Sequence, residues 1–113
     1  MQKIDFIKMH GLGNDFVIID NRIENIDISK NLIHQLSDRK SGAGCDQLIT
    51  INSSNESDID ASIEIFNPGG DRAEACGNGT RCVAKLLFDE SQKKKLNILS
   101  DAGILLAIKK DDS

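Results

Sequence analysis

The chain has 113 residues, which is enough for one hydrophobic core but not for two. Apolar residues make up 39% and charged residues 28%, as in ordinary globular proteins, and no run approaches the ~20 apolar residues of a membrane-spanning helix. The net charge is −4, and four Phe with no Trp or Tyr argue against a basic, base-stacking surface for nucleic acid. Three cysteines, an odd count, favour a reducing compartment. We therefore expect a cytoplasmic protein whose partners include no nucleic acid and no membrane.

Most of the predicted elements are strands. Apolar and polar residues alternate from Ile59 to Ile65, which is the period of a strand with one solvated face. Ser29 can cap a short helix whose buried side carries the apolar residues at 32, 33 and 36. In chain order, we expect strands over residues 4–9, 16–20, 48–51, 59–65, 96–99 and 104–108, a helix from Ser29 to about Asp38, and a second helix that begins near Cys76 and includes residues 82–88.

The order of these elements predicts the fold. The first two strands are joined by a segment containing Gly11 and Gly13, as in a hairpin. A run of strands around one apolar helix predicts an α+β domain with a sheet wrapped around that helix. The last strand ends in a charged tail, residues 109–113, with no later strand to pair with it. We expect this chain to be one domain of a longer protein.

The second predicted helix begins in the most distinctive stretch of the chain, Ala75-Cys76-Gly77-Asn78-Gly79-Thr80-Arg81-Cys82. The two glycines suit a first turn whose backbone approaches something closely, and Asn78 or Thr80 could cap the exposed amides. Cys76 would then lie at the positive end of the helix dipole, which favours a thiolate. The amides of Gly77 and Asn78 could bind a carboxylate.

A second interpretation stays open for this cysteine. A lone cysteine beside an apolar helix is more often a small buried hydrophobic residue than a reactive group. We expect that structural role for Cys82, which lies in the apolar stripe, and for Cys45. Lys85 is expected to extend into solvent rather than to form a Schiff base. No Cys-x-x-Cys pair, His-x-x-x-His pair or phosphate-binding glycine motif occurs, so we expect no metal and no organic cofactor.

Four loops each carry one side-chain amide near a glycine or at the end of a predicted element: Asn14, Gln47, Asn67 and Asn78. Amides offer both donors and acceptors, so together they could bind the ammonium and carboxylate groups of an amino acid without adding charge. For any single loop, Asn beside Gly is more often a turn residue.

Together these motifs resemble the N-terminal half of the diaminopimelate epimerases. The resemblance rests on Met9-His10-Gly11-Leu12-Gly13-Asn14-Asp15-Phe16, the Gly-x-Gly-x-Asp-Gln segment that ends at Gln47, Phe66-Asn67, and the string Ala75 to Cys82. Members of the family are cofactor-independent epimerases built from two similar domains, each of which wraps a mixed or antiparallel barrel-like sheet around a central helix and gives one cysteine to the cleft between them. The resemblance implies that Cys76 is the first cysteine of that pair. It also implies that Asn14, Gln47, Asn67, Gly77 and Asn78 contact the substrate.

The resemblance implies epimerisation of LL-diaminopimelate to the meso form, in lysine and peptidoglycan biosynthesis. Two departures stand out: Pro68-Gly69-Gly70-Asp71 replaces the usual x-Asp-Gly-Ser, and the second half of the family's sequence, with its cysteine, is absent. The expected partners are the small-molecule substrate and the C-terminal domain, and a homodimer stays open. We expect the isolated chain to be inactive. Two alternatives remain: a racemase or isomerase of the same fold with another substrate, and a non-catalytic amino-acid-binding or thiol-sensing module.

Overall fold

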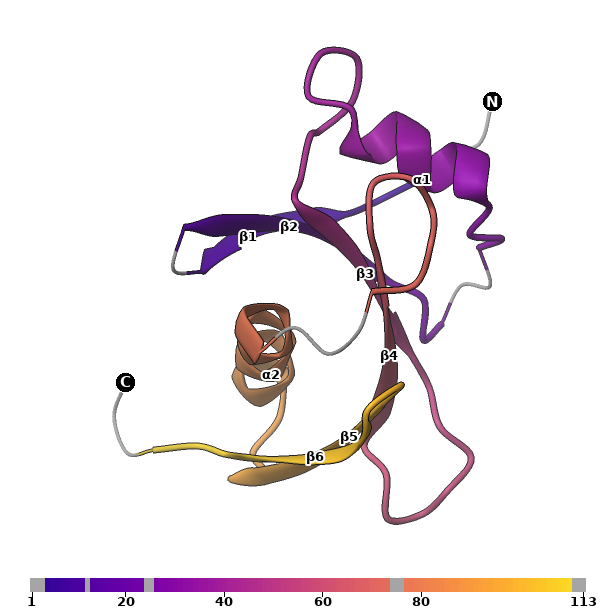
Figure 1. Ribbon diagram of the computed structural model, residues 1–113. Coiled ribbons are helices and arrows are strands. Elements are labelled where there is room, and N and C mark those ends of the chain that lie inside the picture. The colour runs from indigo at the N-terminus through magenta and orange to yellow at the C-terminus, as the bar shows by residue number, and fades with distance from the viewer. Residues whose placement is uncertain (1–3, 12, 24–25, 74–76, 111–113) are drawn as a thin grey trace.

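The computed structural model describes residues 4–11, 13–23, 26–73 and 77–110, which form one six-stranded sheet and two helices (Figure 1). In chain order the elements are β1 Ile7–Gly11, β2 Asn14–Asp20, α1 Lys30–Ser37, β3 Gln47–Asn52, β4 Ala61–Phe66, α2 Gly77–Glu90, β5 Lys95–Ser100 and β6 Gly103–Ile108. The strands lie in the sheet in sequence order. Pairing is antiparallel within β1–β2, β3–β4 and β5–β6, and parallel between β2 and β3 and between β4 and β5. A helix connects the two strands of each parallel pair, because parallel strands need a crossover connection.

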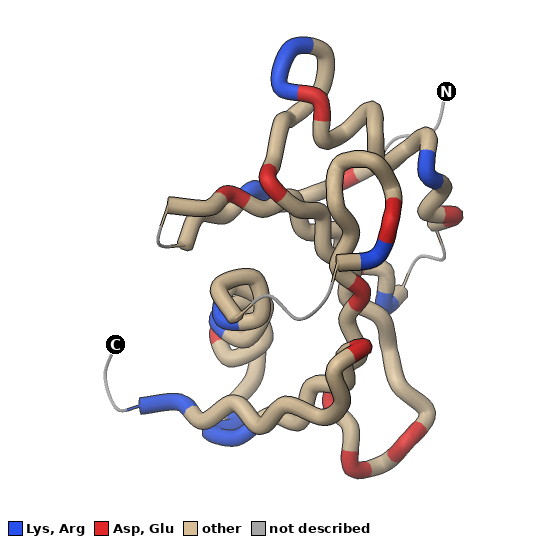
Figure 2. Tube along the Cα trace, viewed as in Figure 1, with Lys and Arg blue, Asp and Glu red and all other residues tan. Residues whose placement is uncertain are grey.

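The sheet curls around α2 as a half-barrel, and α1 packs on its outer face (Figure 1). Side chains along the central strands alternate between the two faces of the sheet, which gives two separate hydrophobic clusters. Phe16 and Ile49 belong to the cluster around α2, whereas Val17 and Leu48 belong to the cluster under α1. All four are fully buried, as expected for strands covered on both faces. Charged residues lie largely in the loops and at the ends of the strands (Figure 2). The predicted α+β fold with a sheet around a central helix is confirmed.

Helix α1 matches its prediction closely. Ser29 is its N-cap, and the Ser29 hydroxyl accepts a hydrogen bond from the amide of Leu32 at 3.1 Å. Ile33 is 1% exposed, and Leu32 and Leu36 pack against the same cluster. The helix therefore buries the predicted stripe against the outer face of the sheet.

Helix α2 corrects one prediction. It begins at Gly77, so Asn78 and Thr80 lie inside its first turn and not at the predicted cap position. The predicted close approach belongs to Gly79, where a Cβ atom would lie 2.7 Å from Cδ1 of Ile49. A Cβ atom at Gly77 would meet nothing within 4 Å among the described residues. Among the described residues, the first turn is therefore closely packed at Gly79 and has no such neighbour at Gly77.

The expectations for the remaining side chains near α2 and α1 are confirmed. Cys82 is buried in the α2 cluster, and Cys45 is buried under α1, where its thiol lies 3.5 Å from the hydroxyl of Ser37. The ammonium-bearing side chain of Lys85 is 65% exposed. Among the described residues, no helix has the length and apolar content needed to cross a bilayer.

Several predicted strand ends were wrong. β1 begins at Ile7 instead of residue 4 and continues to Gly11, which pairs with Asn14, the first residue of β2. Gly13 adopts a φ of 91°, a value that glycine tolerates, so the hairpin closes more tightly than predicted. Ile59 is buried but precedes β4, which begins at Ala61.

Candidate functional site

One end of the half-barrel brings three of the predicted amides together. β2 and β3 are parallel, with Phe16 beside Gln47, so both strands begin at this end. β4 runs the other way, with Phe66 beside Leu48, so Asn67 follows β4 at the same end. Asn14 and Gln47 are each two residues from a side chain that faces α2, and they therefore belong to the α2 face. We call Asn14, Gln47 and Asn67 the amide rim.

Two members of the amide rim are hydrogen-bonded to each other. The Gln47 Nε2 group donates to Oδ1 of Asn67 at 3.4 Å, a long hydrogen bond. The Nδ2 group of Asn67 donates to Oδ2 of Asp71 at 2.9 Å, and this bond lowers the pKa of the Asp71 carboxyl. All three rim residues are half-buried, so part of each remains accessible.

The loop after β4 has a defined shape despite its unusual sequence. The amide of Asn67 donates to the carbonyl of Asp71 at 2.9 Å, and the amide of Gly70 donates to the carbonyl of Asn67 at 2.8 Å. Gly70 has a φ of 94°, and a Cβ atom there would lie 2.8 Å from Cγ of Lys30. The loop therefore forms a closed turn that holds Asn67 at the rim.

The start of α2 lies close to the amide rim. Gly79 packs against Phe16 and Ile49, which lie on the strands that begin with Asn14 and Gln47. The first amides of a helix have no intrahelical acceptors, so those of Gly77 and Asn78 do not donate within α2. The first turn carries no acidic residue, which leaves the positive end of the dipole uncompensated by a side chain of that turn.

Asn78 lies on the side of α2 that faces β1. It lines an open pocket of about 190 Å³ between β1 and α2, together with His10 and Arg81. A Cβ atom at Gly11 would lie 3.8 Å from Cβ of Asn78. The hairpin of β1 and β2 therefore approaches the first turn of α2 closely.

The predicted catalytic residue Cys76 lies outside the described residues, and its place at the start of α2 stays a prediction. It precedes Gly77 in the sequence, and Gly77 is exposed. Within the described ranges, no three His, Cys, Asp or Glu side chains gather in an arrangement that could hold a metal ion.

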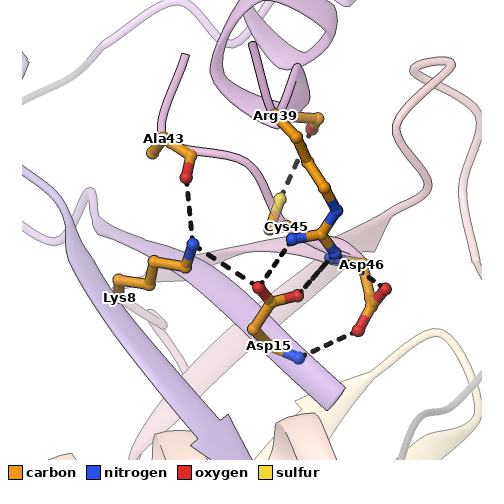
Figure 3. Close-up of polar contacts among 7 residues, drawn as sticks. Lys8, Asp15, Arg39, Ala43, Cys45 and Asp46 are labelled. Carbon is orange, nitrogen blue, oxygen red and sulfur yellow. Dashed lines mark hydrogen bonds and ion pairs between the residues drawn. The ribbon is translucent and has the colours of Figure 1, made fainter.

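A group of ionic side chains beside the amide rim was not predicted. Arg39 bridges the carboxylates of Asp15 and Asp46 at 2.9 and 3.0 Å (Figure 3). This bridge holds the pKa of Asp15 well below its usual range, chiefly through the hydrogen bonds from Arg39. The sequence signal was that Asp15 follows Asn14 and Asp46 precedes Gln47, so each of these amides has an acidic neighbour.

Comparison with known proteins gives the family. Residues 6–113 match the sequence profile described as Diaminopimelate epimerase. The chain belongs to the diaminopimelate epimerase family. It is 52% identical over 102 residues to a diaminopimelate epimerase of Pelagibacter ubique and 38% identical over 109 residues to one of Aromatoleum aromaticum. These matches cover 90% and 95% of this chain but only 36% and 39% of the two relatives.

Solved structures show that the diaminopimelate epimerase fold extends further. The chain matches a methylitaconate-delta-isomerase with a TM-score of 0.71 and 16% identity, over 96% of this chain and 35% of that one. It matches a Bacillus anthracis phenazine biosynthesis protein of the PhzF family with a TM-score of 0.69 and 21% identity, over 96% of this chain and 36% of that one. At such low identity the likeness concerns the fold alone. The predicted resemblance is thus confirmed, and the roles of the individual site residues stay predictions.

Proposed function

We propose that this chain supplies one half of the active site of a diaminopimelate epimerase, which converts LL-diaminopimelate to the meso form in lysine and peptidoglycan biosynthesis. Membership of the family and the 52% identity to the Pelagibacter ubique protein support the substrate and the reaction class. The structural observation that carries the proposal is the amide rim, which lies at one end of the half-barrel beside the start of α2.

The reaction inverts one α-carbon, so a proton must leave one face of that carbon and another must arrive on the opposite face. We assign the base on this side to Cys76, whose thiolate accepts the α-proton while the electron pair of the broken C–H bond stays on the substrate. A thiol on a second domain, outside this chain, would donate a proton to the other face. The two sulfurs then exchange protonation states, and no redox partner is required.

The carbanion formed in this step needs stabilisation. Its charge spreads onto the adjacent carboxylate, and the amides of Gly77 and Asn78 at the start of α2 are suited to bind that group. Gly77 is exposed, and a Cβ atom there would meet nothing within 4 Å among the described residues, which favours the approach of a ligand to its backbone. The exposed Arg81 adds a positive charge in the same part of the helix.

The amide rim suits the rest of the substrate. Diaminopimelate carries an amino-acid group at each end, with both a carboxylate and an ammonium group. Asn14, Gln47 and Asn67 can donate to the former and accept from the latter without adding net charge. A neutral rim thus offers binding without adding a charge that would shift the pKa of the Cys76 thiol.

A chimera tests this proposal. The 113 residues are joined to the part of the Pelagibacter ubique protein that follows its matched segment, and folding is verified by circular dichroism. We expect the chimera to convert LL-diaminopimelate to the meso isomer without added cofactor, as measured by chiral chromatography. Turnover of proline or methylitaconate in place of diaminopimelate would support the alternative of another substrate on the same fold. Binding of diaminopimelate without turnover would support a non-catalytic module.

A further inference from the structure

The ionic group beside the amide rim joins the beginnings of β2 and β3, since Asp15 is the second residue of β2 and Asp46 directly precedes β3. Arg39 donates from Nη1 to Oδ2 of Asp15 at 2.9 Å and from Nη2 to Oδ1 of Asp15 at 2.9 Å. The same Nη2 donates to Oδ1 of Asp46 at 3.0 Å (Figure 3). We call Asp15, Arg39 and Asp46 the ionic clamp. A guanidinium fits this role because its planar donors can bind two carboxylates at once.

The clamp also fixes the backbone of both strands. The amide of Asp15 donates to Oδ2 of Asp46 at 3.0 Å, and the amide of Asp46 donates to Oδ1 of Asp15 at 2.9 Å. The amide of Asp46 lies 3.0 Å from the carbonyl of Asp15 as well. Each carboxylate therefore holds the backbone of the other strand. Asn14 and Gln47 are the neighbours of these two residues in the chain.

Arg39 places its positive charge between two carboxylates that lie close together. The Asp15 side chain is only 13% exposed, and it faces a second carboxylate that shares the same guanidinium. Lys8 contributes a further ion pair to Asp15 at 3.4 Å and a hydrogen bond to the carbonyl of Ala43 at 2.9 Å. Without the guanidinium, the carboxylates of Asp15 and Asp46 would repel each other across the two strand starts.

The loop before β3 is shaped around Arg39. Gly44 has a φ of 76° and is buried, and a Cβ atom there would lie 2.9 Å from Cγ of Arg39. A Cβ atom at Gly42 would lie 2.0 Å from the carbonyl oxygen of Gln35 in α1. Both glycines thus let the loop pass close to α1 and the arginine. This gives the Gly-x-Gly-x-Asp-Gln segment a structural reason: it brings Asp46 to Arg39 and begins β3 at Gln47.

We propose that Arg39 is a positioning residue, which sets the carboxamides of Asn14 and Gln47 toward the substrate through Asp15 and Asp46. This inference rests on the proposed function, in which the amide rim contacts the substrate. Asp15 and Asp46 alternate with Asn14 and Gln47 along their strands, so the clamp lies on the face opposite the rim. Arg39 therefore acts through the backbone. The hydrogen bond from Gln47 to Asn67 is long, at 3.4 Å, so a displacement of Gln47 by a few tenths of an ångström breaks it. The rim is therefore sensitive to small movements of the β3 backbone.

The test uses side-chain amide resonances of the 113-residue chain in ¹⁵N NMR spectra. Arg39→Gln should shift or broaden the NH₂ signals of Asn14 and Gln47 and speed amide exchange at Asp15 and Asp46. Arg39→Lys keeps the positive charge but loses the planar set of guanidinium donors, so it should change the same signals and exchange rates to an intermediate extent. This variant covers the case in which Arg39→Gln does not fold.

The matched control is Arg22→Gln. Arg22 also bridges two carboxylates, those of Asp20 and Glu90, but at the far end of β2. The Arg22→Gln variant should leave the NH₂ signals of Asn14 and Gln47 unchanged. Unchanged rim signals in Arg39→Gln, or equal changes in both variants, would overturn the inference.

Kinetics of the chimera separate this inference from the proposed function. Arg39→Gln should lower kcat/KM for LL-diaminopimelate by about 10- to 100-fold, the scale of a small misplacement in an active site. Arg22→Gln should stay within about twofold of the parent, as expected for a surface change away from the site. An active parent chimera with an unaffected Arg39→Gln variant would refute the positioning role and leave the function standing. An inactive parent with altered rim signals would refute the function and leave the clamp standing.

Discussion

Gly79 gives the sharpest test of how α2 sits against the sheet. A Cβ atom at this position would lie 2.7 Å from Cδ1 of Ile49 and 3.3 Å from Cε1 of Phe16. Both side chains are fully buried, so they have little room to move. Gly79→Ala gains about 1 kcal/mol of helix propensity but adds overpacking of about 1 to 3 kcal/mol. We expect the variant to be less stable than the parent by up to about 2 kcal/mol.

Gly77→Ala is the matched control, because it lies in the same turn and its Cβ atom would meet nothing within 4 Å among the described residues. It gains propensity without overpacking, so Gly79→Ala should be about 1 to 3 kcal/mol less stable than Gly77→Ala. Urea unfolding of the isolated chain, followed by circular dichroism, measures this difference. A Gly79→Ala variant as stable as Gly77→Ala would refute the close approach of α2 to β2 and β3.

Four further outcomes are expected. Cys76 should be alkylated faster than the buried Cys45, and its rate should rise at a pH below the usual thiol range of about 8.5, as resolved by mass spectrometry against pH. Asn67→Ala in the chimera should lower kcat/KM by about 5- to 150-fold, equivalent to 1 to 3 kcal/mol, with a smaller effect on the free energy of unfolding. The pKa of Asp15 is lowered in the folded chain, so its carboxylate contributes stability in full above the unfolded pKa of about 3.9, and this contribution is lost as pH falls from there through the lower folded pKa. Arg39→Gln should therefore lose less stability than the parent as pH falls from about 5 to about 2, as measured by urea unfolding. The isolated chain should form no meso product from LL-diaminopimelate in D₂O, and rapid formation, detected by chiral chromatography, would show that a second acid is available to it.

Local signals in the sequence predicted the elements well where a residue acts on its own neighbours. Ser29 caps α1 three residues before the amide that it binds, and the alternation before Ile65 marks β4. The prediction that Asn78 or Thr80 caps α2 was wrong. Both are suitable cap residues by type, but the helix begins at Gly77, so both lie inside its first turn.

The ionic clamp could not be predicted from local patterns. Asp15 and Arg39 are 24 positions apart, and Asp15 and Asp46 are 31 apart. They meet because β2 and β3, which α1 connects along the chain, pair in parallel. No single segment of the sequence encodes the register of that pairing. The same pairing brings the strand of Asn14 beside the strand of Gln47, so the sequence predicts the members of the amide rim but not their arrangement.

The glycines of the two motif loops serve different purposes. Gly79 and Gly44 make room for close packing, against Ile49 and Arg39 respectively. Gly77 has no such neighbour among the described residues. The sequence alone does not distinguish these three glycines, whereas the structure shows which of them are required for close packing.

The central claim is that Cys76 moves the α-proton, and one measurement tests it most directly. The chimera and its Cys76→Ser and Cys45→Ser variants are incubated with LL-diaminopimelate in D₂O, and deuterium at the α-carbons is followed by NMR together with the yield of meso product. We expect the parent and Cys45→Ser to form deuterated meso product at similar rates, and Cys76→Ser to be slower by about 10²- to 10⁴-fold, the usual contribution of a general acid or base. Parent-like formation of deuterated meso product by Cys76→Ser would contradict the account.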